Sequence, residues 1–191
     1  MSNKIEIIKI SLLGNFGVGK RSIISRYKAD SFREKNLQIG DKTVQLDLWD
    51  TASQEKYHSI SHIFYKSAYV VCLVYDITNQ KSLEDLKEIW YPDLKNYGEK
   101  YTVLAVVGNK SDLYEKEEVK EEEARAFAKE IGAIFMLTSA KNGDNIKHLF
   151  YILAENYLSH KSQVKGVKNE RTGSFRIGIE KNDNYYKKKC C

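Results

Sequence analysis

Apolar residues recur along the chain with two spacings, one typical of strands and the other of helices. Strands are predicted at residues 5–13, 43–49, 69–76, 101–107 and 133–137. In the stretch 43–49, Val44, Leu46 and Leu48 alternate with polar residues and so predict one buried face. The runs 69–76 and 101–107 are almost entirely apolar, which is typical of strands covered on both faces.

Helical spacing lies between these strands. Helices are predicted from Ser22 onward and at residues 82–97, 118–131 and 145–158. Alternation of strands and helices predicts an α/β fold with a mostly parallel sheet of five to six strands and helices on both faces. After Ser159 the periodicity stops, so we expect a folded domain at residues 1–159 and a flexible tail at residues 160–191.

Composition and charge narrow the class of protein. A chain of 191 residues with 42% hydrophobic and 30% charged residues fits one domain with a buried core. The net charge of +5 is concentrated in the tail, which carries nine Lys or Arg and three Asp or Glu, so the domain is nearly neutral. A nucleic-acid binder is expected to carry its basic residues on a folded face, so no nucleic-acid partner is expected.

The cysteine content excludes a disulfide-stabilised protein, and the length of the apolar runs excludes a membrane-spanning helix. Two of the three cysteines are the last two residues, and the third, Cys72, lies in an apolar run where a small buried thiol is expected. This distribution excludes a disulfide framework and fits a reducing cytosolic setting. The longest apolar stretch, residues 68–75, is far shorter than the roughly 20 residues of a spanning helix. The first thirteen residues mix charged residues with Ile and predict a strand instead of a signal peptide.

A glycine-rich segment, Gly14-Asn15-Phe16-Gly17-Val18-Gly19-Lys20, follows the first predicted strand and opens a helix. Glycines allow successive backbone N–H groups to turn toward phosphate oxygens, and the helix N-terminus adds a positive dipole. Lys20 supplies a point charge for the β- and γ-phosphates. The segment predicts a phosphate-binding P-loop, although the last position of the pattern, usually Ser or Thr, is Arg21. An ordinary glycine-rich turn is the alternative.

Two polar segments follow later predicted strands. In Asn109-Lys110-Ser111-Asp112, the Asp can accept hydrogen bonds from the N1–H and the exocyclic amino group of guanine, which adenine cannot offer. In Thr138-Ser139-Ala140-Lys141, backbone N–H groups could meet the guanine O6. Either segment alone could be a polar turn, but their order after successive strands favours a guanine nucleotide site.

The segment Trp49-Asp50-Thr51-Ala52-Ser53-Gln54-Glu55 ends the second predicted strand. Asp50 lies where an acidic residue would hold Mg²⁺ through water, and Gln54 where a side chain would orient an attacking water. Individually they could be a helix cap and a solvated polar residue. The expected nucleotide-binding residues are therefore Gly14, Asn15, Phe16, Gly17, Val18, Gly19, Lys20, Arg21, Ser22, Asp50, Ser53, Asn109, Lys110, Asp112, Ser139, Ala140 and Lys141.

With these segments in place, the chain resembles a Ras-superfamily small GTPase, and more narrowly the Rab family, from about Ile5 to Leu158. The resemblance implies a P-loop G domain that binds GTP and GDP with Mg²⁺, hydrolyses GTP with Gln54 as the catalytic residue, and regulates vesicle-mediated membrane traffic. It also implies that the terminal Cys190-Cys191 pair carries two geranylgeranyl groups, with Lys187, Lys188 and Lys189 against anionic lipid.

The family resemblance further implies partners and a location. Expected partners are escort and GDP-dissociation-inhibitor proteins, an exchange factor and effectors, for a monomer at the cytoplasmic face of endomembranes with a cytosolic pool. The alternative is a non-cycling pseudo-GTPase that acts as a membrane-anchored interaction protein. The tail could also be a solubilising basic segment with incidental cysteines.

Four departures from the family pattern bear on the switch. Arg21 replaces the hydroxyl residue that ligates Mg²⁺, and Ser22 lies one position too late to take that role. The Phe16 ring is expected to crowd the γ-phosphate, and Ser53 replaces a glycine that must move. The segment from Lys20 to Asp50 is about a dozen residues shorter than the family pattern, so the second strand of the family sheet is expected to be absent. Genuine divergence or a misassembled gene sequence would produce the same shortening.

Overall fold

A six-stranded sheet forms the centre of the domain in the computed structural model, which describes residues 5–31, 36–50, 68–97 and 103–166. The strand order is β2-β3-β1-β4-β5-β6, and every neighbouring pair is parallel except β2 and β3. The strands are β1 (Glu6–Leu13), β2 (Leu37–Ile39), β3 (Lys42–Asp50), β4 (Val70–Asp76), β5 (Val103–Asn109) and β6 (Ile134–Leu137). The predicted α/β class with a mostly parallel sheet is confirmed.

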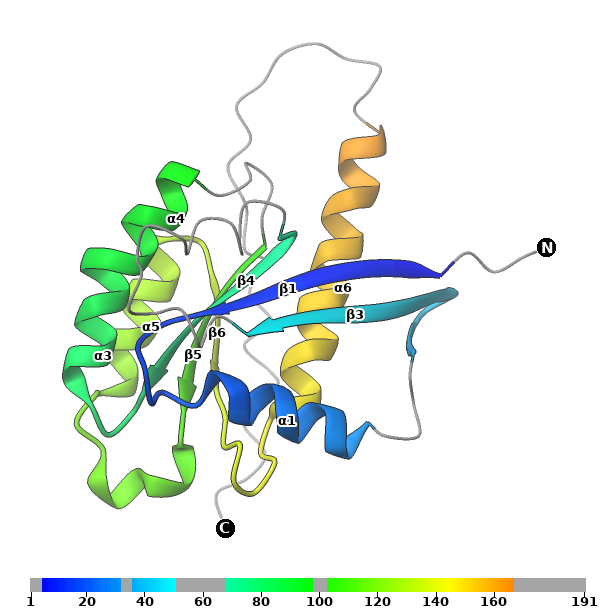
Figure 1. Cartoon of the computed structure of the whole chain (residues 1–191). Coiled ribbons are helices and arrows are strands. Elements are labelled where there is room, and N and C mark those ends of the chain that lie inside the picture. Colours follow the sequence, from blue (N-terminus) through cyan, green and yellow to red (C-terminus); the bar gives the residue numbers. More distant parts are fainter. Residues whose placement is uncertain (1–4, 32–35, 51–67, 98–102, 167–191) are drawn as a thin grey trace.

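Helices cover both faces of this sheet (Figure 1). They are α1 (Lys20–Asp30), α3 (Gln80–Asp85), the π-helical turn η1 (Leu86–Trp90), α4 (Tyr91–Tyr97), the 3₁₀ turn η2 (Ser111–Lys116), α5 (Glu121–Glu130) and α6 (Ile146–Gly166). Figure 1 shows α1 and α6 on one side of the strands, and α3, α4 and α5 on the other. Two buried clusters match this division: Ile23 and Leu153 belong to the first, and Leu83 and Phe127 belong to the second.

Strand β4 lies between these two clusters, and all seven of its residues are buried. Alternate residues of β4 contribute to opposite clusters, as the continuous apolar run predicts for a strand covered on both faces. Cys72 lies in this strand with no exposed surface, and burial raises the pKa of its thiol to about 12. The expectation of a small buried thiol is confirmed.

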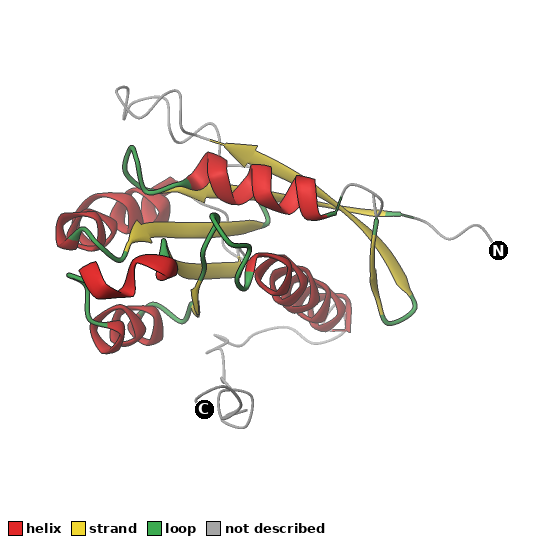
Figure 2. Ribbon diagram, turned by 90° about the horizontal axis from the view of Figure 1, so that it is seen from below, coloured by secondary structure: helices red, strands yellow, loops and turns green. Residues whose placement is uncertain are grey.

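The prediction that the second strand of the family sheet is absent is wrong. Leu37–Ile39 pairs antiparallel with β3, so that Leu37 lies opposite Val44 and Ile39 opposite Lys42 (Figure 2). Gly40 adopts a positive φ of 58° in the two-residue turn between them, a conformation that glycine allows at little cost. The shortened segment therefore retains three residues of strand, because a two-residue turn is enough to reverse the chain.

Helix α6 runs from Ile146 to Gly166, past residue 159, where the apolar periodicity stops. The division into a folded domain and a flexible tail stays a prediction. The polar residues of this extension make contacts that their polarity does not predict. Lys161 forms an ion pair with Glu6, and its ammonium lies 5.6 Å from the centre of the Tyr157 ring. Long cationic side chains can pack their stems on apolar surface while the charged end is paired.

The helix predicted at residues 82–97 is present but contains the π-helical turn η1. The backbone N–H of Tyr91 donates to the carbonyl of Leu86, five residues earlier. Leu86, Trp90 and Leu94 stay buried through this turn, with Trp90 3% exposed, whereas Ile89 is 39% exposed. The helix predicted from residue 118 begins at Glu121, because the N–H groups of Glu118 and Val119 donate to Ile77 instead.

Several predicted residues lie outside the described part of the chain. They are Ser53, Gln54, Lys187, Lys188, Lys189, Cys190 and Cys191. Among the helices that the structure describes, none combines the length and the apolar character needed to cross a bilayer.

Candidate functional site

The predicted site segments meet at one edge of the sheet, where the parallel strands have their carboxyl ends. The glycine-rich loop follows β1. The segment that begins at Asn109 starts with the last residue of β5, and the segment that begins at Thr138 follows β6. Asp50 is the last residue of β3 and lies opposite Leu12 of β1. Ligands of open α/β sheets bind at this edge, so the topology brings together segments far apart in the sequence.

Two glycines of the loop are required by their surroundings. Gly14 has a φ of 139°, and a Cβ there would lie 2.1 Å from the carbonyl oxygen of Val74. Gly19 has a φ of 97°, and a Cβ there would lie 2.2 Å from the amide nitrogen of Asn109. A side chain would force the loop away from β4 at Gly14 and away from β5 at Gly19, so the loop keeps its shape only with glycine.

Lys20 begins α1, and its side chain turns back into the loop. Its Nζ donates to the carbonyl oxygens of Gly14 at 2.6 Å and Asn15 at 2.8 Å, and the residue is 2% exposed. Val18, in the same loop, is also 2% exposed. The loop therefore encloses a positive charge at a helix N-terminus, an arrangement that attracts anions.

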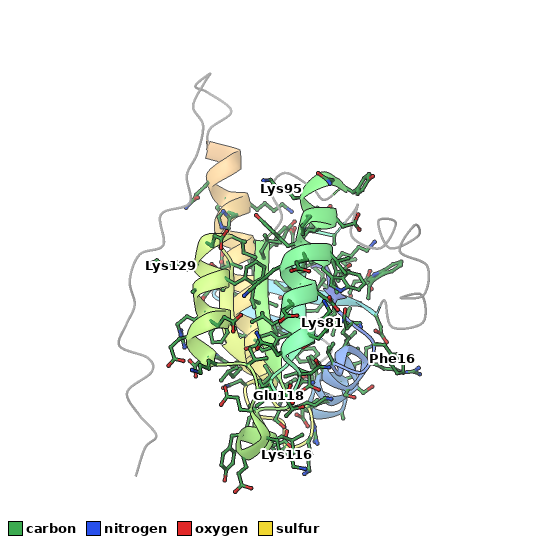
Figure 3. The ribbon with its side chains drawn as sticks, turned by 90° about the vertical axis from the view of Figure 1, so that its left-hand side faces the viewer. Phe16, Lys81, Lys95, Lys116, Glu118 and Lys129 are labelled. Carbon is green, nitrogen blue, oxygen red and sulfur yellow. The ribbon has the colours of Figure 1, made fainter. Side chains whose placement is uncertain are left out.

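Other residues of this segment face solvent. Arg21 and Ser22, in the first turn of α1, are exposed. The Phe16 ring is 85% exposed, and Figure 3 shows it projecting from the body of the domain. The ring thus packs little on the protein, and its crowding of a γ-phosphate stays a prediction.

Asn109 joins the glycine-rich loop to the segment after β6. Its Nδ2 donates to the carbonyl oxygen of Val18 at 2.8 Å, and its Oδ1 accepts from the backbone N–H of Ala140 at 3.2 Å. The residue is 1% exposed. A single buried amide therefore fixes three loops relative to one another, since the donor and the acceptor of its side chain reach different segments.

Lys110 occupies the left-handed region with a φ of 67°, which turns the chain sharply after β5. Its Nζ lies 2.5 Å from Oδ2 of Asp76, the last residue of β4. The other carboxylate oxygen of Asp76 accepts from the N–H and the hydroxyl of Thr78. The Asp76 carboxylate, which sequence reasoning did not include, thus orients Lys110 at the site edge.

Asp112, the residue expected to read the base, is held by the segment after β6. The hydroxyl of Ser139 donates to Oδ1 of Asp112 at 2.6 Å, and Nζ of Lys141 lies 3.6 Å from Oδ2. The Ser139 hydrogen bond is the main cause that holds the pKa of Asp112 below its ordinary value, and the charge of Lys141 adds to it. Asp112 is therefore an ionised acceptor at neutral pH.

Arg26 contacts one of the predicted site segments, and sequence reasoning missed this contact. It lies on α1, and its Nε donates to the carbonyl oxygen of Ala140 at 2.9 Å, while a second guanidinium nitrogen donates to that of Lys141. Two donors of one fork thus fix the backbone of the segment that carries Ser139. No local signal marks this role, because Arg26 looks like an ordinary polar residue on the outer face of a helix.

The described residues are a poor fit to a bound Mg²⁺. The position that follows Lys20 carries the cationic Arg21, and no group of three or more His, Cys, Asp or Glu residues suited to a metal occurs in the part of the chain that the structure describes. Asp50 supplies one carboxylate at the end of β3. Hard cations such as Mg²⁺ require oxygen ligands, so one described carboxylate, with Arg21 in place of a hydroxyl residue, is an incomplete set.

Comparison with known proteins gives consistent matches. The Ras family matches residues 9–159 of the chain. The chain is 40% identical to the Ras-related protein RABF2b of Arabidopsis thaliana over 164 residues, covering 80% of this chain and 82% of that protein. It is 38% identical to the Ras-related protein Rab5A of Oryza sativa subsp. japonica over 168 residues, covering 82% of each.

A longer match is with the Ras-related protein Rab-31 of Homo sapiens, which is 35% identical over 200 residues and covers 98% of both chains. This alignment has more positions than the 191 residues of the present chain. Some positions of the human protein therefore have no counterpart here.

Proposed function

This chain belongs to the Ras family, as a Rab-type small GTPase, and we propose from this that it binds GTP and GDP at the carboxyl edge of its sheet. The phosphates lie in the loop from Gly14 to Lys20, and the guanine base lies between the segments that begin at Asn109 and Thr138. In this role the protein regulates vesicle-mediated membrane traffic.

The Asn109 side chain is the observation that carries the nucleotide-binding proposal. One buried amide contacts both the Val18 carbonyl of the proposed phosphate loop and the Ala140 N–H of the proposed guanine segment. Such an arrangement would hold the phosphate and base sites at a fixed separation. Asp112, ionised and oriented by Ser139, supplies the acceptor that guanine requires.

Titration of the purified full chain with fluorescent GDP and GTP, with and without Mg²⁺, tests this function. Competition by unlabelled GDP but not by ADP would support guanine recognition by Asp112. Equal competition by ADP, or no saturable binding, would overturn it. The matched variant is Asp112→Asn, which exchanges an acceptor pair for an amide and should weaken GDP binding while favouring xanthosine diphosphate, whose base carries a carbonyl in place of the amino group.

Members of the family hydrolyse GTP, and we assign GTP hydrolysis to this chain at a rate below the usual intrinsic rate. Gln54 is proposed to orient the attacking water, while Arg21, Phe16 and Ser53 all disfavour the reaction. Single-turnover hydrolysis of radiolabelled GTP measures the rate. A rate equal to that of ordinary family members, unaffected by chelation of Mg²⁺, would contradict this proposal.

A non-cycling interaction protein on the same fold is the second candidate. The observation that favours it is the poor Mg²⁺ fit of the described residues, with the exposed Arg21 beside the loop. In this case the chain binds guanine nucleotide without a preference between GTP and GDP, because the γ-phosphate and the metal order no switch segment. A ratio of GTP and GDP affinities near one, together with absent hydrolysis, would favour this candidate.

We further propose that the chain is anchored to membranes by geranylgeranyl groups on Cys190 and Cys191, with Lys187, Lys188 and Lys189 against anionic headgroups. Two lipid chains bind a bilayer stably, and each lysine near the surface adds about 1 kcal/mol. The double substitution Cys190→Ser with Cys191→Ser should move the protein from membranes to cytosol. Unchanged partitioning in a membrane flotation assay would contradict the anchor.

The same proposal includes partners and a location. A prenylated chain requires escort and GDP-dissociation-inhibitor proteins to cover its lipids, and a switch requires an exchange factor and effectors. The expected location is the cytoplasmic face of endomembranes with a cytosolic pool, and the protein is expected to be a monomer without a nucleic-acid partner. Fractionation of cells that express the tagged chain measures the two pools.

A further inference from the structure

The side chain of Asn15, inside the glycine-rich loop, is tied to the helix that packs beside the loop. Its Nδ2 donates to Oδ2 of Asp85 at 2.6 Å, and its Oδ1 accepts from the indole Nε1–H of Trp90 at 2.9 Å. Trp90 is 3% exposed and Asn15 is half-buried, so the indole contact is partly shielded from solvent. The loop is therefore connected through a side chain to the junction of α3 and α4.

An asparagine is suited to this position by its chemistry. Trp90 can only donate a hydrogen bond, and an ionised Asp85 can only accept one. The partner between them must offer a donor and an acceptor on one short arm, which the Asn15 amide does. An aspartate at this position would place two carboxylates within hydrogen-bond distance, and an alanine would leave the buried indole N–H without this acceptor.

The π-helical turn is what brings Asp85 and Trp90 to the same side of their helix. In a regular α-helix, residues five apart are separated by roughly 140° around the axis, because each residue rotates by about 100°. In η1 the Tyr91 N–H reaches back five residues to Leu86, which places residues of this spacing nearly above one another. Isolated π-helical turns are frequent at functional sites, and this one aligns the two residues that contact Asn15.

The backbone of Asn15 belongs to the same arrangement. Lys20 donates to its carbonyl oxygen at 2.8 Å, and the preceding Gly14 is pressed against Val74. The loop is thus fixed at Gly14 by close packing, at Asn15 by its side chain, and at Val18 by Asn109. Without the Asn15 contacts, the stretch from Asn15 to Gly17 would lose its side-chain attachment to α3.

We propose that Asn15 is a positioning residue, held by Asp85 and Trp90, that keeps the loop in the shape that receives the β-phosphate. This inference rests on the proposed nucleotide-binding function and adds a named mechanism to it. Asp85 is also paired with Lys81 at 2.8 Å, and Lys81 is exposed on α3 (Figure 3). The exposed Lys81 ammonium therefore balances the charge of the Asp85 carboxylate that holds Asn15.

A charge-reversal cycle tests this role. Asn15→Asp alone should raise the Kd for GDP by about tenfold or more, the loss expected for a hydrogen bond to a charged group replaced by repulsion. The Kd for GMP, which lacks the β-phosphate, should change by no more than about twofold on the same reasoning. Adding Asp85→Asn restores a donor–acceptor pair with its polarity reversed, so the double variant should recover most of the GDP affinity.

Glu88→Gln is the matched control for Asp85→Asn, because it also removes one negative charge, but from an exposed residue of η1. It should leave both dissociation constants unchanged. An equal loss of GDP and GMP affinity in Asn15→Asp would indicate general unfolding of the site and would overturn the positioning role. Failure of Asp85→Asn to rescue would also overturn it.

A second readout follows the contact without nucleotide. In the ¹H–¹⁵N spectrum the chain has two indole signals, from Trp49 and Trp90, and Trp49→Phe assigns them. Asn15→Ala should shift the Trp90 indole signal and speed its hydrogen exchange, whereas Glu88→Gln should not. An unchanged Trp90 signal would overturn the contact.

The outcomes separate this inference from the function on which it rests. If the unaltered chain binds no guanine nucleotide, the proposed function fails, and the role of Asn15 fails with it. If the unaltered chain binds GDP but Asn15→Asp leaves the ratio of GDP and GMP affinities unchanged, only the positioning role fails.

Discussion

The Nδ2 of Asn109 lies 2.8 Å from the carbonyl oxygen of Val18, although 91 positions separate the two residues. The contact crosses from the end of β5 to the glycine-rich loop after β1, which are not neighbouring strands. Because Gly19 leaves no Cβ in the way, the amide approaches the loop backbone directly. This approach explains the glycine at position 19 more specifically than a general need for flexibility.

Removal of this amide should destabilise the fold and loosen the site together. Asn109→Ala leaves the buried Val18 carbonyl and the Ala140 N–H without this partner, at a cost of about 1–3 kcal/mol in the free energy of unfolding. Chemical denaturation of the unliganded protein measures this change. Asn142→Ala, in an exposed loop, is the control and should change stability little. Equal stability of the two variants would contradict the role of Asn109.

The hydrogen bond from Ser139 to Asp112 predicts a pH dependence. The pKa of Asp112 is lowered in the folded state, so its ionised form stabilises the fold above the ordinary aspartate pKa of about 3.9, and this contribution is lost as pH falls through the lower folded pKa. Ser139→Ala should raise the pKa of Asp112 toward its ordinary value. GDP affinity of this variant should therefore decline at a higher pH during acidification.

The control for the pH experiment is Ser162→Ala, which removes a hydroxyl that bonds within α6. Its pH profile should match that of the unaltered chain. If Ser139→Ala also matches that profile, the Ser139 hydrogen bond does not determine the acid limit of nucleotide binding.

Arg26 should influence nucleotide retention from outside the predicted motifs. Arg26→Ala removes the donors to the Ala140 and Lys141 carbonyls, and GDP dissociation should accelerate by about three- to tenfold, as expected for a modest net hydrogen-bond loss. Stopped-flow release of fluorescent GDP measures this rate. Lys28→Ala removes the same charge from an exposed position of α1 and should have no effect. Equal rates in both variants would rule out the role of Arg26.

Arg21 predicts an unusual response to Mg²⁺. In the unaltered chain, chelation of Mg²⁺ should change GDP dissociation little, whereas Arg21→Ser should create a dependence, because a hydroxyl oxygen replaces a cation beside the phosphates. The measurement is GDP release with and without chelator. Strong chelator sensitivity of the unaltered chain, abolished by Ser22→Ala, would show instead that the neighbouring hydroxyl serves the metal.

The strands and site segments were predictable because their signals are local. The apolar run of β4 and the alternation in β3 follow from burial on two faces or one, and a glycine-rich stretch between a strand and a helix has few other uses. The order of segments along the chain also predicts that they meet, since parallel strands place their carboxyl ends at one edge. The fold class and the gathering of the site therefore follow from short-range patterns.

Predictions failed where a contact from elsewhere in the structure decides the local conformation. Strand β2 has only three residues, too few to show a strand pattern in the sequence. It forms because these residues pair with β3. The last two turns of α6 look polar in sequence. Lys161 within them forms an ion pair with Glu6, a residue near the start of the chain. The π-helical turn η1 interrupts the regular helix predicted at residues 82–97, and the apolar pattern gives no sign of it, because Leu86, Trp90 and Leu94 still recur four residues apart.

The sequence by itself therefore determined the α/β class, the edge of the sheet where the predicted site segments meet and the residue types that suit a guanine nucleotide, because these depend on local spacing and on the order of segments along the chain. Only the tertiary structure decided which side chains hold those segments together. Asn15 with Trp90, Asn109 with Val18, and Arg26 with Ala140 are pairs separated by many residues, and no local period encodes their meeting. Hydrogen bonds of this kind depend on the position of a donor and an acceptor within about 3 Å, which the packing of the whole domain sets.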